Sequence, residues 1–186
     1  MNHPSPTSIL PNLFRYQLTW LATVLGTAHG KADLGAFIGF LMIVLHFKKC
    51  HHLLAEYKTV FTTLLFGGLW ELLLVQQQWV VYEGTSAITI VPVWILILWT
   101  AFGATLNGCL GWFKSHLGWA MLFGAAGGPL AWSGGAALGA LSVPNPLLGY
   151  PVISLGWAVM MPLLSFLARY FSLNSPFIDA EVGRVN

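Results

Sequence analysis

Charged side chains are scarce in this sequence, and their scarcity excludes most soluble folds. Only 8% of the 186 residues are Asp, Glu, Lys or Arg, whereas an ordinary soluble domain has about 25%. If this chain were water-soluble, it would have too few charged residues to cover its surface. The formal net charge of +2 is too small to indicate a nucleic-acid-binding surface, so we expect no nucleic-acid partner.

The sequence also lacks recognisable catalytic motifs. It has no GxSxG motif, no histidine box of the metal-binding type, no Walker loop and no apolar segment that carries two carboxylates. These absences argue against an enzyme.

Histidine and cysteine gather in one place, in the stretch His46-Phe-Lys-Lys-Cys50-His51-His52. Metal binding is conceivable for such residue types. However, no paired CxxC or HxxxH motif accompanies the stretch, and the adjacent lysines oppose a bound cation. We therefore expect no metal and no cofactor.

Hydrophobic residues make up 56% of the chain. A membrane-spanning helix needs about 20 mostly apolar residues, and its backbone must satisfy its own hydrogen bonds. We predict an all-α membrane protein with a bundle of six transmembrane helices in residues 13–171, between cytoplasmic segments 1–12 and 172–186. The second segment is short, so five spans with a re-entrant second segment are the alternative. The six segments are 13–30, 34–47, 59–79, 91–113, 117–141 and 148–171.

The basic residues predict which end of the bundle faces the cytoplasm. Short cytoplasmic loops hold an excess of Lys and Arg. With six spans, Lys31 stands alone on the outer side, and both termini are cytoplasmic. Cys50 and Cys109 then lie near the reducing face, where a disulfide is not expected. The basic residues on the inner side are Arg15, Lys48, Lys49, Lys58, Lys114, Arg169 and Arg184.

Small residues follow one face of the fourth and of the fifth segment. Stripes of small residues let helix backbones approach closely in lipid. We therefore predict that these two helices pack against each other through their glycines, which are Gly103, Gly111, Gly124, Gly128, Gly135 and Gly139.

Two amides, Gln17 and Asn107, occupy the same depth near the cytoplasmic boundary, judged by a rise of about 1.5 Å per residue. We predict that they hydrogen-bond each other. Polar side chains at membrane depth mark either packing or function, and both readings stay open for this pair.

Glu71 is the one acidic residue that we place inside a predicted span. An ionised side chain at mid-bilayer costs about 2.5–3.5 kcal/mol on the mildest scale, so we expect Glu71 to be largely uncharged at pH 7. Pro129 lies at the same depth and frees the carbonyl of Ala125. We predict that Glu71 faces this kink as a ligand or proton site, with a purely structural acid as the alternative.

Several stretches form a specific combination along the chain. They include Gln17-Leu-Thr-Trp-Leu-Ala-Thr, a second helix ending in His46, Pro92-Val-Trp94, Phe102-Gly-Ala-Thr-Leu-Asn107 and Gly124-Ala-Ala-Gly-Gly-Pro129. With these stretches the chain resembles a bacterial membrane family called domain of unknown function 2878. The resemblance implies a bacterial inner-membrane protein and supplies no reaction, substrate or partner.

Three functions remain open. The first is a non-enzymatic accessory or assembly subunit, or a binder of a lipid-like ligand, whose partners are membrane lipids or a protein of a membrane complex. The second is a small transporter with Glu71 as its protonatable group and the Pro129 kink as its hinge. The third is a lipid-modifying enzyme, which requires Glu71, Asn107 and a histidine to converge.

Overall fold

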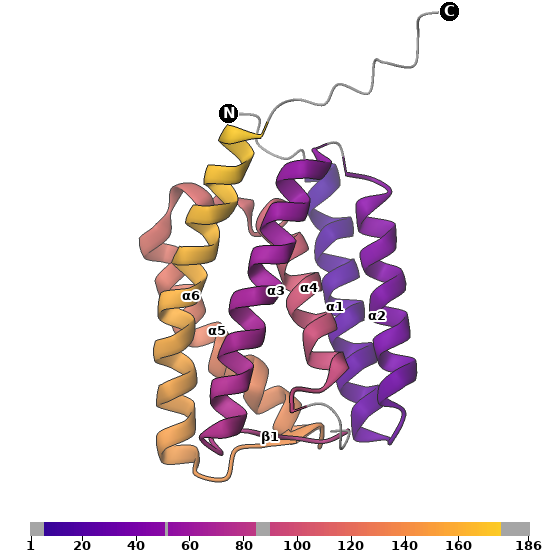
Figure 1. Cartoon of the computed structure of the whole chain (residues 1–186), viewed down its shortest axis with the longest axis vertical. Coiled ribbons are helices and arrows are strands. Elements are labelled where there is room, and N and C mark those ends of the chain that lie inside the picture. The colour runs from indigo at the N-terminus through magenta and orange to yellow at the C-terminus, as the bar shows by residue number, and fades with distance from the viewer. Residues whose placement is uncertain (1–5, 51, 85–89, 176–186) are drawn as a thin grey trace, which may run out of the picture.

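The chain folds into a helical bundle (Figure 1), and the computed structural model describes residues 6–50, 52–84 and 90–175. The described residues form six α-helices, a short 3-10 helix and two short strands. The elements are α1 (Pro6–Ala28), α2 (Ala32–Phe47), α3 (Leu53–Gln76), β1 (Val81–Tyr82), α4 (Val93–Leu106), η1 (Gly111–Ser115), α5 (Leu117–Ala137), β2 (Leu141–Ser142) and α6 (Pro146–Asn174).

The helices associate as neighbouring pairs. α1 packs on α2, α3 on α4, and α5 on α6. The α3–α4 pair lies between the other two pairs, α4 contacting α1 and α2 while α3 contacts α6 (Figure 1). α1 begins and α6 ends at the same end of the bundle, which we call the basic end because Lys48, Lys49, Lys58, Lys114 and Arg169 lie there.

Glycines set the close approaches within these pairs. A Cβ added at Gly35 of α2 would overlap the backbone of Ala22 in α1. A Cβ at Gly103 of α4 would lie 2.9 Å from the Cα of Val60 in α3. Gly103 and Gly35 therefore let backbones meet where a larger residue would hold them apart.

The predicted contact between the fourth and fifth helices is wrong. Gly103 lies against α3, whereas Gly124 and Gly128 of α5 lie against Trp157 of α6. The glycine pattern indicates a close approach but does not encode which helix approaches. α4 and α5 instead face each other across a cavity.

The remaining glycines of the two stripes have other environments. Gly135 lies against the side chain of Leu141, just beyond α5. Gly139 has a φ of +85°, the left-handed conformation that follows many helix ends, and a Cβ there would meet open space. Gly111 begins η1.

Several predicted boundaries also change. The fourth helix ends at Leu106, so Asn107 caps it and the segment up to residue 113 continues as a turn and η1. The second segment is a continuous helix along α1, not a re-entrant turn. The antiparallel β1–β2 ladder at the other end was not predicted. It holds Tyr82 in place beneath the helices.

The segments expected outside the bundle are partly helical, because α1 begins at Pro6 and α6 runs to Asn174. Residues 1–5 and 176–186, and with them Arg184, lie outside the described residues, as does His51. What we expected of them stays a prediction.

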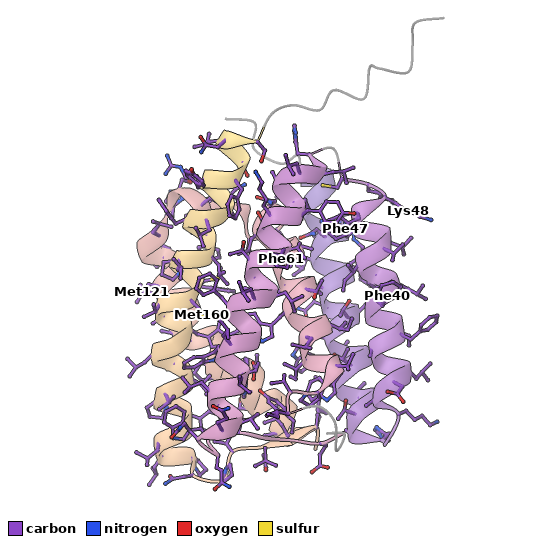
Figure 2. The ribbon with its side chains drawn as sticks, in the orientation of Figure 1. Phe40, Phe47, Lys48, Phe61, Met121 and Met160 are labelled. Carbon is purple, nitrogen blue, oxygen red and sulfur yellow. The ribbon has the colours of Figure 1, made fainter. Side chains whose placement is uncertain are left out.

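Two helices, α3 and α6, are long and apolar enough to cross a membrane, and α2 and α4 are shorter apolar helices. Large apolar side chains also lie on the outer surface of the bundle (Figure 2): Phe40 of α2 is 51% exposed and Phe61 of α3 is 67% exposed. Membrane association is indicated, while six crossings remain a prediction.

Candidate functional site

A cavity of about 390 Å³ lies between α1, α4 and α5. Its volume falls within the range of about 300–1,000 Å³ that small-molecule sites occupy. We call it the α1–α5 cavity. Its lining includes Tyr16, Gln17, Trp20, Trp94, Trp99, Phe102, Phe123, Gly127, Gly128, Leu130, Ala131, Trp132 and Trp157, with Glu71 contributed by α3.

The walls of the cavity are largely aromatic. Five of the nine tryptophans of the chain line it, namely Trp20, Trp94, Trp99, Trp132 and Trp157. The rings of Trp99 and Trp157 stack with centroids 5.0 Å apart, and Trp132 meets Trp157 edge-on at 5.8 Å. Among the described residues that line the cavity, Glu71 is the one charged side chain.

Glu71 is fully buried, with 0% of its surface exposed. Its carboxyl group accepts hydrogen bonds from two neutral donors, the hydroxyl of Tyr82 and the Nε1–H of Trp99 at 2.9 Å. Trp132 of α5 donates to the Tyr82 hydroxyl at 3.0 Å. This Glu71 network therefore connects α3, β1, α4 and α5, and it satisfies a buried acid without a cation.

The predicted bond between Glu71 and the kink at Pro129 is not formed. The carbonyl oxygen of Ala125, which Pro129 frees, accepts a hydrogen bond of 2.8 Å from the hydroxyl of Ser154 in α6. Pro129 thus belongs to the α5–α6 contact, and α5 reaches Glu71 through Trp132 and Tyr82.

The predicted pairing of Gln17 with Asn107 is also wrong. Gln17 is exposed on α1 and lies at the cavity lining. The Asn107 amide nitrogen donates to Glu56 at 2.9 Å and to Thr59 at 3.2 Å, and its oxygen accepts from Lys114 and Ser172. Equal depth placed the two amides in one layer but on different sides of the bundle.

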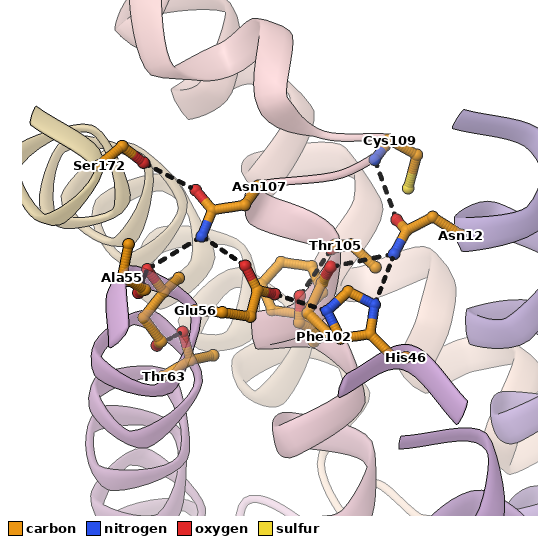
Figure 3. Close-up of polar contacts among 12 residues, drawn as sticks. Asn12, His46, Ala55, Glu56, Thr63, Phe102, Thr105, Asn107, Cys109 and Ser172 are labelled. Atoms are coloured by element: carbon orange, nitrogen blue, oxygen red, sulfur yellow. Dashed lines mark hydrogen bonds and ion pairs between the residues drawn. The ribbon is translucent and has the colours of Figure 1, made fainter. Parts of the chain in front are cut away.

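Asn107 belongs to a chain of polar contacts near the basic end (Figure 3). We call Asn12, His46, Glu56, Asn107 and Lys114 the amide cluster. Lys114 Nζ donates to Asn107 at 2.9 Å, Asn107 donates to Glu56, and His46 Nε2 lies 2.7 Å from Glu56 Oε1. Burial lowers the pKa of the Lys114 ammonium, and Glu56 opposes that change. The cluster joins α1, α2, α3, the connection from α4 to η1, and η1 itself.

The orientation of Asn12 fixes the proton on His46. Asn12 Nδ2 donates to the carbonyl of Ala104 at 3.0 Å, and its Oδ1 accepts from the backbone N–H of Cys109 at 2.9 Å. The same Nδ2 lies 3.4 Å from His46 Nδ1, which must therefore be the acceptor nitrogen. In the neutral ring the proton then sits on Nε2 and points at Glu56. The amide cluster is internally satisfied and acts as a crosslink between helices.

The ligand atoms of His46, Cys50 and Glu56 lie within 4.8 Å of one another, which is a geometry that could hold a metal ion. A metal on His46 Nε2 would move the ring proton to Nδ1, where the Asn12 amide nitrogen offers it no acceptor. Burial raises the pKa of the Cys50 thiol, and the charge of Glu56 raises it further. A raised pKa disfavours the thiolate, which is the form that binds metals. We assign no metal to this group.

The second cysteine is similarly inert. Cys109 lies in the connection between α4 and η1, and burial raises the pKa of its thiol to about 11. At neutral pH the thiolate form is therefore scarce, which argues against a cysteine nucleophile.

Five residues of the two networks were not singled out from the sequence: Asn12, Glu56, Tyr82, Trp99 and Trp132. Glu56 carried a usable signal, since it follows His46 by ten residues across a short connection between antiparallel helices. Tyr82 carried none, because its position depends on the β1–β2 pairing of segments far apart in the chain.

Comparison with known proteins agrees with the resemblance read from the sequence. The family model described as "Protein of unknown function (DUF2878)" matches residues 9–163. No curated protein matches the chain, and no solved structure matches it.

Proposed function

We propose that this chain, which belongs to the family described as protein of unknown function (DUF2878), is a multi-pass membrane protein that binds a lipid-like molecule in the α1–α5 cavity. One observation carries the proposal: an apolar, aromatic cavity of about 390 Å³ reaches a single buried acid, Glu71. Ligand sites in proteins combine apolar walls with a few placed polar groups in this way.

The outer surface supports placement in a membrane. Exposed apolar side chains occur along α1, α3, α5 and α6, including Phe14 at 67%, Leu69 at 58%, Leu130 at 70% and Leu155 at 69%. Exposed apolar patches of such extent mark surfaces that face lipid or a partner. The concentration of lysines at the basic end favours an inner-membrane orientation with both chain ends in the cytoplasm.

The rim of the cavity supports entry from the lipid. Leu13 of α1, Phe123 of α5 and Leu130 of α5 line the cavity and are also exposed on the outer surface, by 39%, 46% and 70%. An apolar molecule could thus pass between α1 and α5 without crossing water.

The other functions have less support. A lipid-modifying enzyme requires Glu71, Asn107 and a histidine to converge, but Asn107 and His46 bond to Glu56 in the amide cluster while Glu71 bonds to Tyr82 and Trp99. No contact among the described residues favours an assembly subunit over a ligand binder.

The test fills the cavity without disturbing the fold. A Cβ at Gly127 would meet one atom of Phe123 at 3.8 Å, so Gly127→Leu adds a side chain at the cavity lining at little packing cost. The protein is transferred from its own membrane directly into nanodiscs and purified. The lipids that co-purify with it are then quantified by mass spectrometry. We expect the wild type to retain one enriched species and Gly127→Leu to lose it by about tenfold, equivalent to about 1.4 kcal/mol.

Gly118→Leu is the matched control. Gly118 lies on α5 outside the cavity lining, and a Cβ there meets nothing within 4 Å. This variant should retain the enriched species. Equal lipid content in all three proteins would contradict the proposal.

A further inference from the structure

The inference concerns the polar end of the ligand and rests on the proposed function. Glu71 is buried, and its oxygens accept from Tyr82 and Trp99, which are both neutral donors. No described lysine, arginine or histidine forms an ion pair with it. A buried carboxylate without a compensating charge is strongly unfavourable. A proton or a bound cation must therefore supply that charge.

The surroundings of Glu71 suit a cation better than they suit an anion. The cavity that Glu71 reaches is also lined by Trp94, Trp99, Trp132 and Trp157. Tryptophan faces attract ammonium groups within about 6 Å. Trp99 and Trp157 turn one face of each ring toward the other, so the aromatic wall open to a cation comes mainly from the other rings. When a bound cation replaces the proton, the side chain of Glu71 adds a full negative charge beside these rings.

Anionic amphiphiles fit poorly. None of the described residues at the cavity lining is a lysine, an arginine or a histidine, so a carboxylate or phosphate head would find no cation there. The same head would be repelled by an ionised Glu71 in surroundings of low dielectric constant, where such repulsion is large.

We infer that the α1–α5 cavity binds a lipophilic organic cation, an amphiphile with a substituted ammonium head, whose charge is balanced by Glu71 beside the aromatic wall of the cavity. The apolar part of the ligand then fills the remaining cavity between α1 and α5.

The test uses two ions of closely similar shape and opposite charge, tetraphenylphosphonium and tetraphenylborate. Binding to the full chain in nanodiscs is measured by equilibrium dialysis, and empty nanodiscs supply the membrane partition that is subtracted. We expect the wild type to bind the phosphonium at least about tenfold tighter than the borate, a difference of about 1.4 kcal/mol. This comparison needs no variant.

Two substitutions locate the charge. Glu71→Gln should lose about tenfold in phosphonium affinity while it retains a folded helical spectrum. Glu83→Gln, an exposed acid outside the cavity lining, should bind as the wild type does. If Glu71→Gln does not fold, Gly127→Leu provides the second variant and should lose the phosphonium by filling the cavity.

The outcomes separate this inference from the proposed function. A wild type that retains lipid in a Gly127-dependent way, yet binds phosphonium no better than borate, overturns the inference and leaves the proposed function standing. A wild type that retains no lipid and binds neither ion overturns both. Phosphonium binding that is unchanged in a folded Glu71→Gln variant overturns the assignment of Glu71 as the counter-charge.

Discussion

Tyr82 organises the buried acid, although it lies outside the helices. Its hydroxyl donates to Glu71 and accepts from Trp132, so one group serves as donor and acceptor between α3 and α5. The pairing of Tyr82 with Leu141 in the β1–β2 ladder sets its position. The orientation of the Glu71 carboxyl group thus depends on a short strand at the end of the bundle opposite the basic end.

Tyr82→Phe tests this dependence with little change of volume. Without the hydroxyl, Trp132 loses its acceptor and Glu71 loses one donor, and each buried group left unsatisfied costs about 1–3 kcal/mol. We expect the free energy of unfolding in detergent, followed by circular dichroism, to fall by about that amount. The control is Tyr170→Phe, because Tyr170 is 53% exposed. Equal stability of the two variants would show that the Glu71 network does not stabilise the fold.

Small residues on one face of α5 have two kinds of surroundings. Gly124 and Gly128 line the cavity and also lie directly on Trp157 of α6. Gly127 and Ala131 line the cavity, and a Cβ at Gly127 would meet a single atom within 4 Å. Small residues on a single helix therefore serve both a tight contact and an open volume.

Gly128→Leu and Gly127→Leu distinguish these two surroundings. A Cβ at Gly128 would lie 2.5 Å from Cδ1 of Trp157, whereas the one at Gly127 would meet one atom of Phe123 at 3.8 Å, an ordinary contact distance. Overpacking typically costs about 1–3 kcal/mol, so Gly128→Leu should lower the thermal midpoint in detergent while Gly127→Leu leaves it unchanged. Similar midpoints for the two variants would mean that the α5–α6 contact is misplaced.

Sequence patterns predict the elements of this bundle better than their partners. Runs of apolar residues located all six helices, because a helix that contacts lipid or other helices along its length needs a long apolar segment. The end of α4 was missed because Asn107 fitted the small and polar face of a longer helix, and no proline marks the end. Which helix meets a glycine face depends on the whole bundle, and no local pattern records it.

The polar sites show the same limit: the sequence predicts which polar residue is buried but not which groups it bonds to. Burial of Glu71 follows from its apolar neighbours in α3, and its lack of a cationic partner follows from composition. Its actual donors could not be predicted, since Trp99 is 28 residues away and Tyr82 is placed by a strand pairing. Depth alone predicted that Gln17 and Asn107 would pair, but depth does not specify the side of a helix.

At the scale of the whole molecule, charge and apolar surface are arranged along one axis. The lysines of the α2–α3 connection, α3 and η1 lie at the basic end, and Lys31 lies at the other end beside the start of α2. The cavity and Glu71 lie between them, within an apolar outer surface. The proposed function requires this axis to cross a membrane.

The sidedness of two exposed lysines tests that requirement most directly. In a background with Cys50→Ser and Cys109→Ala, single cysteines replace Lys31 or Lys58, which are both exposed and lie at opposite ends of the bundle. A membrane-impermeant maleimide is added to intact cells and to broken cells. The account predicts that Lys31→Cys is labelled in intact cells and Lys58→Cys only after breakage. Equal labelling of the two positions in intact cells, or recovery of the protein in the soluble fraction, would contradict it.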